Sequence, residues 1–278
     1  MKPIKIMING LPGNVSTRIA DHLVKDNRFE LLPWSLTGPE IEQPEASIGP
    51  VAVRLVRPDK KEETIAEIKN TAGRFICVDY THPASVNDNC EFYCRQGLPF
   101  VMGTTGGDRE KLANAVRRSD ISAVIAPNMA KQIVGFQAMM EYAAREFPGM
   151  FEGYSLTIKE SHQQGKADTS GTAKAMVRYF NALGINFSES DIIKERDPEK
   201  QAGQWHIPAE YLGGHAWHTY TLLSPDKTVK FEFTHNINGR DVYADGTAAA
   251  VIFLDRACRR GEQGTVFSMI DVLKGSKP

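Results

Sequence analysis

The sequence has few cysteines, and none of them lies where a metal site or a disulfide framework would need it. Its 278 residues include four, namely Cys77, Cys90, Cys94 and Cys258. Cys90 and Cys94 are close in sequence, but no histidine or further cysteine follows at the spacing of a zinc site. We therefore expect reduced thiols and no metal, as in a cytoplasmic protein.

Long apolar runs and a net charge of one sign are also missing. No apolar segment approaches the length that crosses a bilayer, and the segment 1–10 is interrupted too soon to be a secretory signal. The 33 Lys and Arg residues balance 34 Asp and Glu residues, so no basic field attracts nucleic acid or anionic lipid. We expect no nucleic-acid or membrane partner, and local groups must hold any anionic substrate.

The first half of the chain alternates short apolar segments with helix-like stretches. This rhythm is typical of a parallel sheet with helices on both faces, so residues 1–130 are predicted to form a Rossmann-like, dinucleotide-binding domain of α/β class. The predicted strands are Ile4–Ile8, Phe29–Trp34, Val51–Val56, Arg74–Asp79, Pro99–Met102 and Ile121–Ala126, and the predicted helices are Asn14–Asp26, Glu62–Asn70, Pro83–Gln96 and Asp108–Ser119.

A second domain of α+β type, with a mixed and mostly antiparallel sheet, is predicted over residues 131–239. Its turn signal Pro225-Asp226-Lys227 separates two alternating segments and predicts a hairpin. We expect residues 240–278 to complete the first domain. The remaining predicted elements are the helices Gln132–Phe147, Gly171–Leu183 and Ala244–Arg259 and the strands Tyr154–Glu160, Tyr220–Ser224 and Thr228–Thr234.

A glycine turn follows the first predicted strand and opens a helix. Gly10 would permit the tight turn, and Gly13 would let the backbone approach a pyrophosphate at the helix N-terminus. Ser16 occupies the third glycine position of the usual pattern. A purely structural turn is the alternative, but the strand–turn–helix context favours a bound dinucleotide.

The end of the second predicted strand bears on which dinucleotide binds. An Asp or Glu there would bind the ribose 2′-hydroxyl of NAD, and none is present, because Glu30 lies at the wrong end of the strand. Ser35 and Thr37 could donate hydrogen bonds to a 2′-phosphate. We expect a weak preference for NADPH, with NADH also possible.

Two further loops follow predicted parallel strands, where such sheets bind ligands. Gly103, Thr104 and Thr105 combine flexible backbone with hydroxyl groups, although an ordinary turn would also explain them. The second loop, with Ala126, Asn128 and Met129, is predicted to flank a nicotinamide ring.

The most informative segment runs from Glu160 to Ala173. Ser170, Gly171 and Thr172 place hydroxyls and backbone N–H groups at a helix start, which is a natural receptor for a carboxylate. His162 and Lys166 in the preceding loop supply a group that titrates near neutrality and a cation. We predict a catalytic site here. His215 and His218 resemble a metal pair only superficially, because the sequence shows no third ligand.

Several of these motifs together resemble the dihydrodipicolinate reductase family, and most of all its plant and cyanobacterial branch. The resemblance runs nearly end to end. The matching motifs are ESHQQGKADTSGTAKA (160–175), FVMGTTGGDR (100–109), VDYTHPASVNDN (78–89), FEFTHNINGRDVYADGT (231–247) and SMIDVL (268–273).

The resemblance implies an NAD(P)H-dependent reduction of the dehydration product of 4-hydroxy-tetrahydrodipicolinate to tetrahydrodipicolinate, in lysine biosynthesis. It also implies a homotetramer or a dimer joined through the second domain. His162 and Lys166 take the catalytic positions, and their division of roles stays open. The implied substrate contacts are Thr104, Gln163, Ser170, Gly171 and Thr172, and the implied cofactor contacts include Gly10, Gly13, Asn14, Val15, Asp79, Tyr80, Thr81, Thr104, Arg240 and Tyr243.

Two residues depart from the family pattern. Gln163 stands where many bacterial members have a second histidine, which weakens any scheme with two histidines, and Ser16 could loosen cofactor binding. Two alternatives stay open: a reductase of another cyclic imino dicarboxylate, and a non-catalytic NAD(P)-binding regulator. The His162–Lys166 pair disfavours the regulator, which needs no proton donor.

Overall fold

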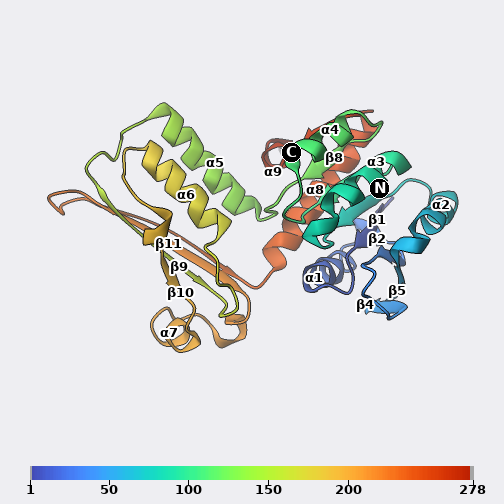
Figure 1. Ribbon diagram of the computed structural model, residues 1–278, viewed down its shortest axis with the longest axis horizontal. Coiled ribbons are helices and arrows are strands. Elements are labelled where there is room, and N and C mark those ends of the chain that lie inside the picture. Colours follow the sequence, from blue (N-terminus) through green and yellow to red (C-terminus); the bar gives the residue numbers. More distant parts are fainter. Residues whose placement is uncertain (1, 276–278) are drawn as a thin grey trace. The chain divides into compact units, whose positions relative to one another are not determined.

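The computed structural model describes residues 2–275, so Met1 and residues 276–278, which the sequence prediction placed in the first domain, lie outside the described residues. The chain divides into two compact units (Figure 1). Unit 1 comprises Met1–Lys131 and Asp241–Pro278, and unit 2 comprises Gln132–Arg240. Within the described residues, no helix is long and apolar enough to span a membrane.

Unit 1 contains a six-stranded sheet in which every pairing is parallel. The first strand, β1, lies beside the edge strand β2, and the chain then crosses over to add the other four strands on the opposite side of β1. This confirms the predicted Rossmann-like class. In sheet order the strands are β13 (Val266–Phe267), β8 (Ala123–Ile125), β7 (Phe100–Met102), β6 (Ile76–Asp79), β1 (Ile4–Asn9) and β2 (Phe29–Leu31).

Alternation along the strands gives this sheet two buried faces. Met7 and Cys77 pack in a core cluster with apolar residues of α2, α3 and α4, whereas α8 contacts β6, β7 and β8 and also packs against α1. Helices on both faces explain why the strands read as nearly continuous apolar runs. The helices of unit 1 are α1 (Asn14–Leu23), α2 (Lys61–Ala72), α3 (Val86–Gln96), α4 (Arg109–Arg117), α8 (Asp241–Arg259) and α9 (Met269–Gly275).

The predicted strand Phe29–Trp34 is in fact two strands in different sheets. Pro33, which has no N–H to donate, separates β2 from β3 (Trp34–Leu36). β3 pairs with β5 (Val51–Val56) and β5 pairs with β4 (Glu45–Ile48), which forms a small separate sheet that the sequence did not predict.

Helix α8 approaches the chain at Met129 closely enough to require a glycine. A Cβ added to Gly246 would overlap the carbonyl group of Met129. This contact fixes α8 against the loop that follows β8.

We predict that Gly246→Ala destabilises unit 1, because backbone rather than a flexible side chain blocks the added methyl group. The loss in unfolding free energy should be about 1–3 kcal/mol or more, measured by urea denaturation. Gly203→Ala is the matched control, since a Cβ at Gly203 meets no atom within 4 Å. Equal stability of the two variants would contradict the contact.

Unit 2 contains a mixed four-stranded sheet, as predicted. Its order is β10 (Ile193–Glu195), β9 (Ser155–His162), β11 (His215–Leu223) and β12 (Lys230–Asn238), with only the β10–β9 pairing parallel. Helices α5 (Lys131–Glu146) and α6 (Gly171–Ala182) lie over one face of this sheet (Figure 1) and pack with Ile158 and Tyr220. The short α7 (Pro198–Gly203) follows β10.

The register of this sheet places three ionisable residues in one row. Glu160 on β9 lies opposite His218 on β11, and His218 lies opposite His235 on β12. Glu160 and His218 are buried. The predicted strands began at Tyr220 and Thr228, so the sequence did not reveal this row.

Candidate active site

The glycine turn of unit 1 has the shape that a pyrophosphate site requires. Gly10 has φ +101°, and a Cβ there would meet the Tyr80 carbonyl, while a Cβ on Gly13 would lie 2.8 Å from the Gly10 oxygen. The Ser16 hydroxyl donates to the Gly10 carbonyl at 2.7 Å and to the Gly13 carbonyl at 2.9 Å. The hydroxyl at the third glycine position therefore braces the turn. Asn14 and Val15 begin α1 directly after it.

A cavity of about 920 Å³ opens beside this turn, within unit 1. Such a volume lies in the range of cofactor sites. The predicted residues Gly10, Gly13, Tyr80 and Thr81 all line it. The glycine contacts and the cavity together fit a dinucleotide, whose pyrophosphate would lie at the start of α1.

Asp79, a predicted cofactor contact, is instead buried at the centre of a hydrogen-bond network. Its Oδ1 accepts from the Thr81 amide and hydroxyl and from Thr104 Oγ1, and its Oδ2 accepts from Tyr93 and Asn89. The carboxylate therefore positions its neighbours rather than presenting itself to a ligand. Because the Thr104 hydroxyl donates to Asp79, Thr104 offers a ligand an acceptor oxygen.

Ser35 and Thr37 do not act as the sequence suggested. The fully buried Ser35 Oγ accepts from the Leu11 amide at 3.2 Å, and Thr37 Oγ1 donates to the Leu11 carbonyl at 2.8 Å. Both hydroxyls are thus engaged in holding the glycine turn. The expected direct bond from Ser35 to a 2′-phosphate is corrected to this supporting role.

Three charged residues of the cavity wall were missed in the sequence, namely Glu40, Lys61 and Asp88. Glu40 lies four residues beyond β3, but its side chain folds back, so that a Cβ on Gly38 would overlap its carboxylate. Lys61, at the start of α2, also lines the cavity, with its Nζ 4.6 Å from the Phe92 ring centroid. The loop fold, which the sequence does not show, brings the acid back beside the strand end.

The remaining cofactor-side residues differ in exposure. Thr105 is exposed, whereas Ala126 and Met129 are buried. The Asn128 side chain accepts from the Ala130 amide at 2.9 Å and so shapes the backbone before α5. Gly103, Arg240 and Tyr243 are half-buried, and Tyr243 lies on α8.

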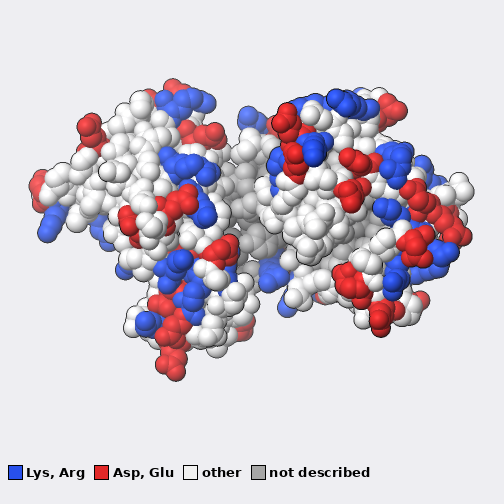
Figure 2. Space-filling view, in the orientation of Figure 1, with Lys and Arg blue, Asp and Glu red and all other residues white. Residues whose placement is uncertain are grey.

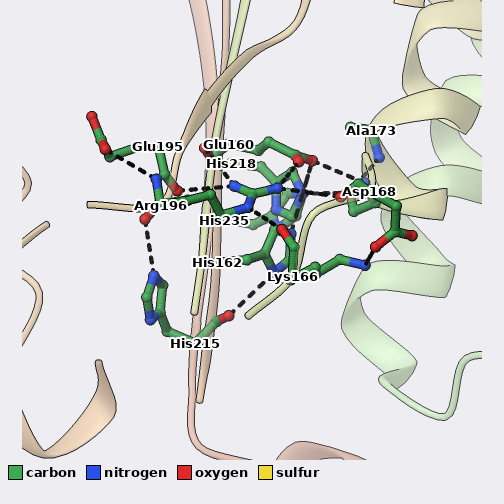
Figure 3. Close-up of polar contacts among 12 residues, drawn as sticks. Glu160, His162, Lys166, Asp168, Ala173, Glu195, Arg196, His215, His218 and His235 are labelled. Atoms are coloured by element: carbon green, nitrogen blue, oxygen red, sulfur yellow. Dashed lines mark hydrogen bonds and ion pairs between the residues drawn. The ribbon is translucent and has the colours of Figure 1, made fainter. Parts of the chain in front are cut away.

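In unit 2, a buried ion pair organises the predicted catalytic loop (Figure 3). Glu160 is fully buried, and Arg196 donates to its Oε1 at 2.5 Å. The same guanidinium donates to the carbonyls of Lys166 and Asp168, at 2.6 and 3.3 Å. Burial acts to raise the pKa of Glu160, but the interactions with His218, Arg196 and Ser170 outweigh it and hold the pKa well below its usual value.

The predicted carboxylate receptor forms the start of α6. Ser170 caps the helix, since its Oγ accepts from the Ala173 amide at 3.0 Å. The Ser170 amide is already bonded to Glu160 Oε2 at 3.2 Å. The N–H groups of Gly171 and Thr172 belong to the first turn, where no helix carbonyl can accept them, so they are the backbone donors suited to an anion.

His162 and Lys166 come from the end of β9 and the loop after it. His162 Nδ1 lies 3.2 Å from the His215 carbonyl, which requires the proton on Nδ1 and leaves the Nε2 lone pair 3.8 Å from Glu160. Burial, and then the nearby His218, lower the pKa of His162 to about 4. Lys166 Nζ donates to Asp168 at 2.8 Å. At neutral pH the loop therefore holds a neutral imidazole and a cation.

Glu160, His162 and His218 also form a cluster with metal-ligand character. Their ligand atoms lie within 4.8 Å of one another, an arrangement the sequence prediction of no metal did not foresee. Arg196 already neutralises the Glu160 carboxylate, and Ser170 occupies its second oxygen. We therefore interpret the cluster as an ion-pair network.

We predict that the half-buried His235 makes unit 2 less stable in acid. Burial, and then His218, lower the pKa of His235 from 6.5 to about 3. Between these two pH values His235 is therefore protonated in the unfolded chain but not in the folded chain. The unfolding free energy should fall as the pH drops below 6.5, by up to ~1.4 kcal/mol per pH unit for such a histidine. His235→Phe should show a shallower fall in urea titrations down to about pH 4.

His206→Asn is the control for this prediction, because His206 is exposed and asparagine tolerates its positive φ of 55°. It should retain the slope of the parent protein. An unchanged slope in His235→Phe would show that His235 does not contribute.

Comparison with known sequences bears on these two units directly. Residues 4–129 match the sequence model described as dihydrodipicolinate reductase, N-terminus, and residues 133–273 match the one described as dihydrodipicolinate reductase, C-terminus. The chain belongs to the dihydrodipicolinate reductase family. This confirms the resemblance drawn from its motifs.

Relatives in this family share most of their length with the chain. The probable 4-hydroxy-tetrahydrodipicolinate reductase 2, chloroplastic, of Oryza sativa subsp. japonica is 43% identical over 97% of this chain and 82% of its own. The 4-hydroxy-tetrahydrodipicolinate reductase 1, chloroplastic, of Arabidopsis thaliana is 42% identical over 98% and 78%. The chain is therefore an oxidoreductase that uses a nicotinamide cofactor.

These relatives also correct one expectation. The cytoplasmic location expected from the sequence is wrong on this comparison, because four similar plant proteins are named as chloroplastic. Reduced cysteines and a short apolar start do not distinguish the two compartments.

Solved structures show the same fold. Dipicolinate-bound dihydrodipicolinate reductase from Paenisporosarcina sp. TG-14 is 18% identical, with a TM-score of 0.66 over 96% of this chain and 97% of that chain. A dehydrogenase from Thermus thermophilus, solved with NAD, is 12% identical, with a TM-score of 0.53 over 98% and 92%.

Proposed function

We propose that this enzyme reduces the dehydration product of 4-hydroxy-tetrahydrodipicolinate to tetrahydrodipicolinate with NAD(P)H, in lysine biosynthesis. The observation that carries the proposal is the segment from the end of β9 to the start of α6, which places His162 and Lys166 beside an anion-receiving helix start. The names of the family relatives refer to this reaction.

Recognition of the dicarboxylate would rest on local charge. Figure 2 shows positive and negative side chains interspersed on the visible surface of each unit, and the formal net charge of the chain is only -1. Lys166 would bind one carboxylate with the N–H groups of Gly171 and Thr172 and the Ser170 hydroxyl. Charge-assisted bonds of this kind are the stronger ones. Gln163, half-buried beside them, and Thr104 in unit 1 are the other proposed substrate contacts.

Lys166 is the proposed proton donor. When bound beside the Gly10–Gly13 turn, a reduced nicotinamide cofactor would supply the hydride for a ring carbon conjugated with the imine, which would leave negative charge on the substrate ring. His162 is neutral at pH 7, because its pKa is lowered to about 4, and its Nδ1 proton is held by a carbonyl. Its Nε2 is buried beside Glu160, so His162 would shape the site as a neutral group, while the ammonium of Lys166 stabilises the charge and delivers the proton.

We propose a weak preference for NADPH over NADH. Lys61 lines the cavity and His82 stands at its wall, and both favour a 2′-phosphate. The Glu40 carboxylate disfavours a 2′-phosphate, since an acid in this place binds ribose hydroxyls and repels phosphate. The opposing charges support use of both cofactors.

A homo-oligomer, either a tetramer or a dimer, is proposed to form through the sheet of unit 2. The supporting feature is β12, a nine-residue strand at the edge of the sheet, where Phe231 is 42% exposed. Unpaired edges of this length invite pairing with another chain.

Lys166→Ala is predicted to lower kcat by about 10²-fold or more, because it removes the proton donor and a carboxylate contact. NADPH binding, measured by fluorescence titration, should change little, since the cofactor cavity lies in unit 1. Lys174→Ala, on the surface of α6, is the control and should retain turnover. Normal turnover in Lys166→Ala would exclude the proposed site.

Glu40→Gln is predicted to raise the ratio of kcat/KM for NADPH to that for NADH by about 5- to 10-fold, because it removes a charge that repels the 2′-phosphate. Glu42→Gln is the matched control, because Glu42 is exposed two residues away. Initial rates with both cofactors measure the ratio. An equal shift in both variants would mean that Glu40 acts only through the overall charge.

A further inference from the structure

The hydroxyl of Ser170 has two polar neighbours besides any ligand. Its Oγ accepts from the Ala173 amide at 3.0 Å and lies 2.9 Å from His218 Nε2. Ser170 and His218 are only 6% and 2% exposed. A hydroxyl has one proton and two lone pairs. Whether the Ser170 proton is available to a substrate therefore depends on the direction of its bond with His218.

The surroundings of His218 decide this direction. Its Nε2 also faces an acceptor, Glu160 Oε2, at 3.6 Å, and its Nδ1 has no hydrogen-bond partner within residues 2–275. A proton on Nδ1 would be a buried, unpaired N–H, and the Nε2 lone pair would then face a carboxylate. Both arrangements are unfavourable. The proton therefore lies on Nε2, and His218 donates to Ser170.

We propose that His218 is a positioning residue that makes the Ser170 hydroxyl a dedicated donor for the substrate carboxylate. With both lone pairs of Oγ engaged by Ala173 and His218, the O–H bond points away from them. This leaves the proton for an anion at the start of α6, where Gly171 and Thr172 offer their N–H groups. The inference rests on the proposed function and adds a residue that does not itself contact substrate.

Glu160 takes part in the same arrangement. Its Oε2 accepts from the Ser170 amide, which fixes the serine backbone, and faces His218 Nε2, which favours the donating tautomer. Arg196 holds the other oxygen of that carboxylate. Glu160 thus fixes the Ser170 amide and His218 fixes the Ser170 hydroxyl oxygen, so that only the hydroxyl proton remains for a ligand.

The test compares His218→Gln with His218→Asn. The glutamine amide places an N–H where Nε2 stands, and the asparagine amide, one methylene shorter, places it near Nδ1. We expect the asparagine variant to raise KM for the dicarboxylate roughly tenfold with kcat within about twofold, and the glutamine variant to restore most of the loss. The inhibition constant of dipicolinate, used as a probe, should follow the same order.

A double variant tests whether the effect passes through Ser170. In the background of Ser170→Ala, adding His218→Asn should raise KM by less than about twofold, because the shared hydrogen bond is already lost. His235→Phe is the control: its ring stacks on His218 at 4.7 Å between centroids, but its Nε2 is bonded to Tyr220. It should leave KM unchanged.

The outcomes separate this inference from the proposed function. A parent enzyme that does not oxidise NADPH with the substrate overturns the function itself. An active parent whose asparagine variant keeps the parental KM overturns the role of His218 alone. Equal losses in the asparagine and glutamine variants, or a full additional loss in the double variant, would show that His218 acts through folding, and would also overturn it.

Discussion

The buried carboxylate of Glu160 is the group on which the geometry of unit 2 depends. An isolated carboxylate cannot stay charged in the protein interior, and breaking a buried pair costs far more than the pair contributes. Arg196 therefore has to remain on Glu160, and the rest of its guanidinium binds the carbonyls of Lys166 and Asp168. The need to neutralise Glu160 near the end of β9 thereby fixes the loop that holds Lys166 and Asp168, which has no regular secondary structure of its own.

Unit 1 also contains a buried carboxylate that fixes neighbouring loops, here on the cofactor side. Asp79 ends β6 and is fully buried, and five donor groups from Thr81, Thr104, Tyr93 and Asn89 satisfy it. The strand ends that meet at the cofactor side are thus held by hydrogen bonds to one acid. In both units a buried acid beneath a loop supplies the order that the loop itself lacks. Preorganised donors of this kind are what stabilise developing charge.

The sequence revealed what local patterns encode. The βαβ rhythm, the glycine turn and the helix start at Ser170 were predicted from neighbouring residues, because periodicity and capping are local properties. Arg196 was not predicted, since β10, which precedes it, has three residues and no alternation, and its ion pair with Glu160 joins positions 36 residues apart. Glu40 was also not predicted, because only the folded loop brings its side chain back beside the end of β3. Direct cofactor contact was expected of Ser35 because sequence shows a hydroxyl but not its direction.

Two cations interact with the loop between β9 and α6, Lys166 within it and Arg196 after β10, and they differ in a way that suits their roles. Arg196 is 17% exposed in its side chain and binds a fully buried acid, so changing its partner would strand a charge in the interior. Lys166 pairs with Asp168, whose side chain is 77% exposed, and such surface pairs contribute little. A substrate carboxylate can therefore replace Asp168 as the partner of Lys166 at small cost, while water takes over the released acid. The site thus combines one cation, Arg196, that is fixed for structure with another, Lys166, that is free to change partners, and only Lys166 can follow the charge of a reacting substrate.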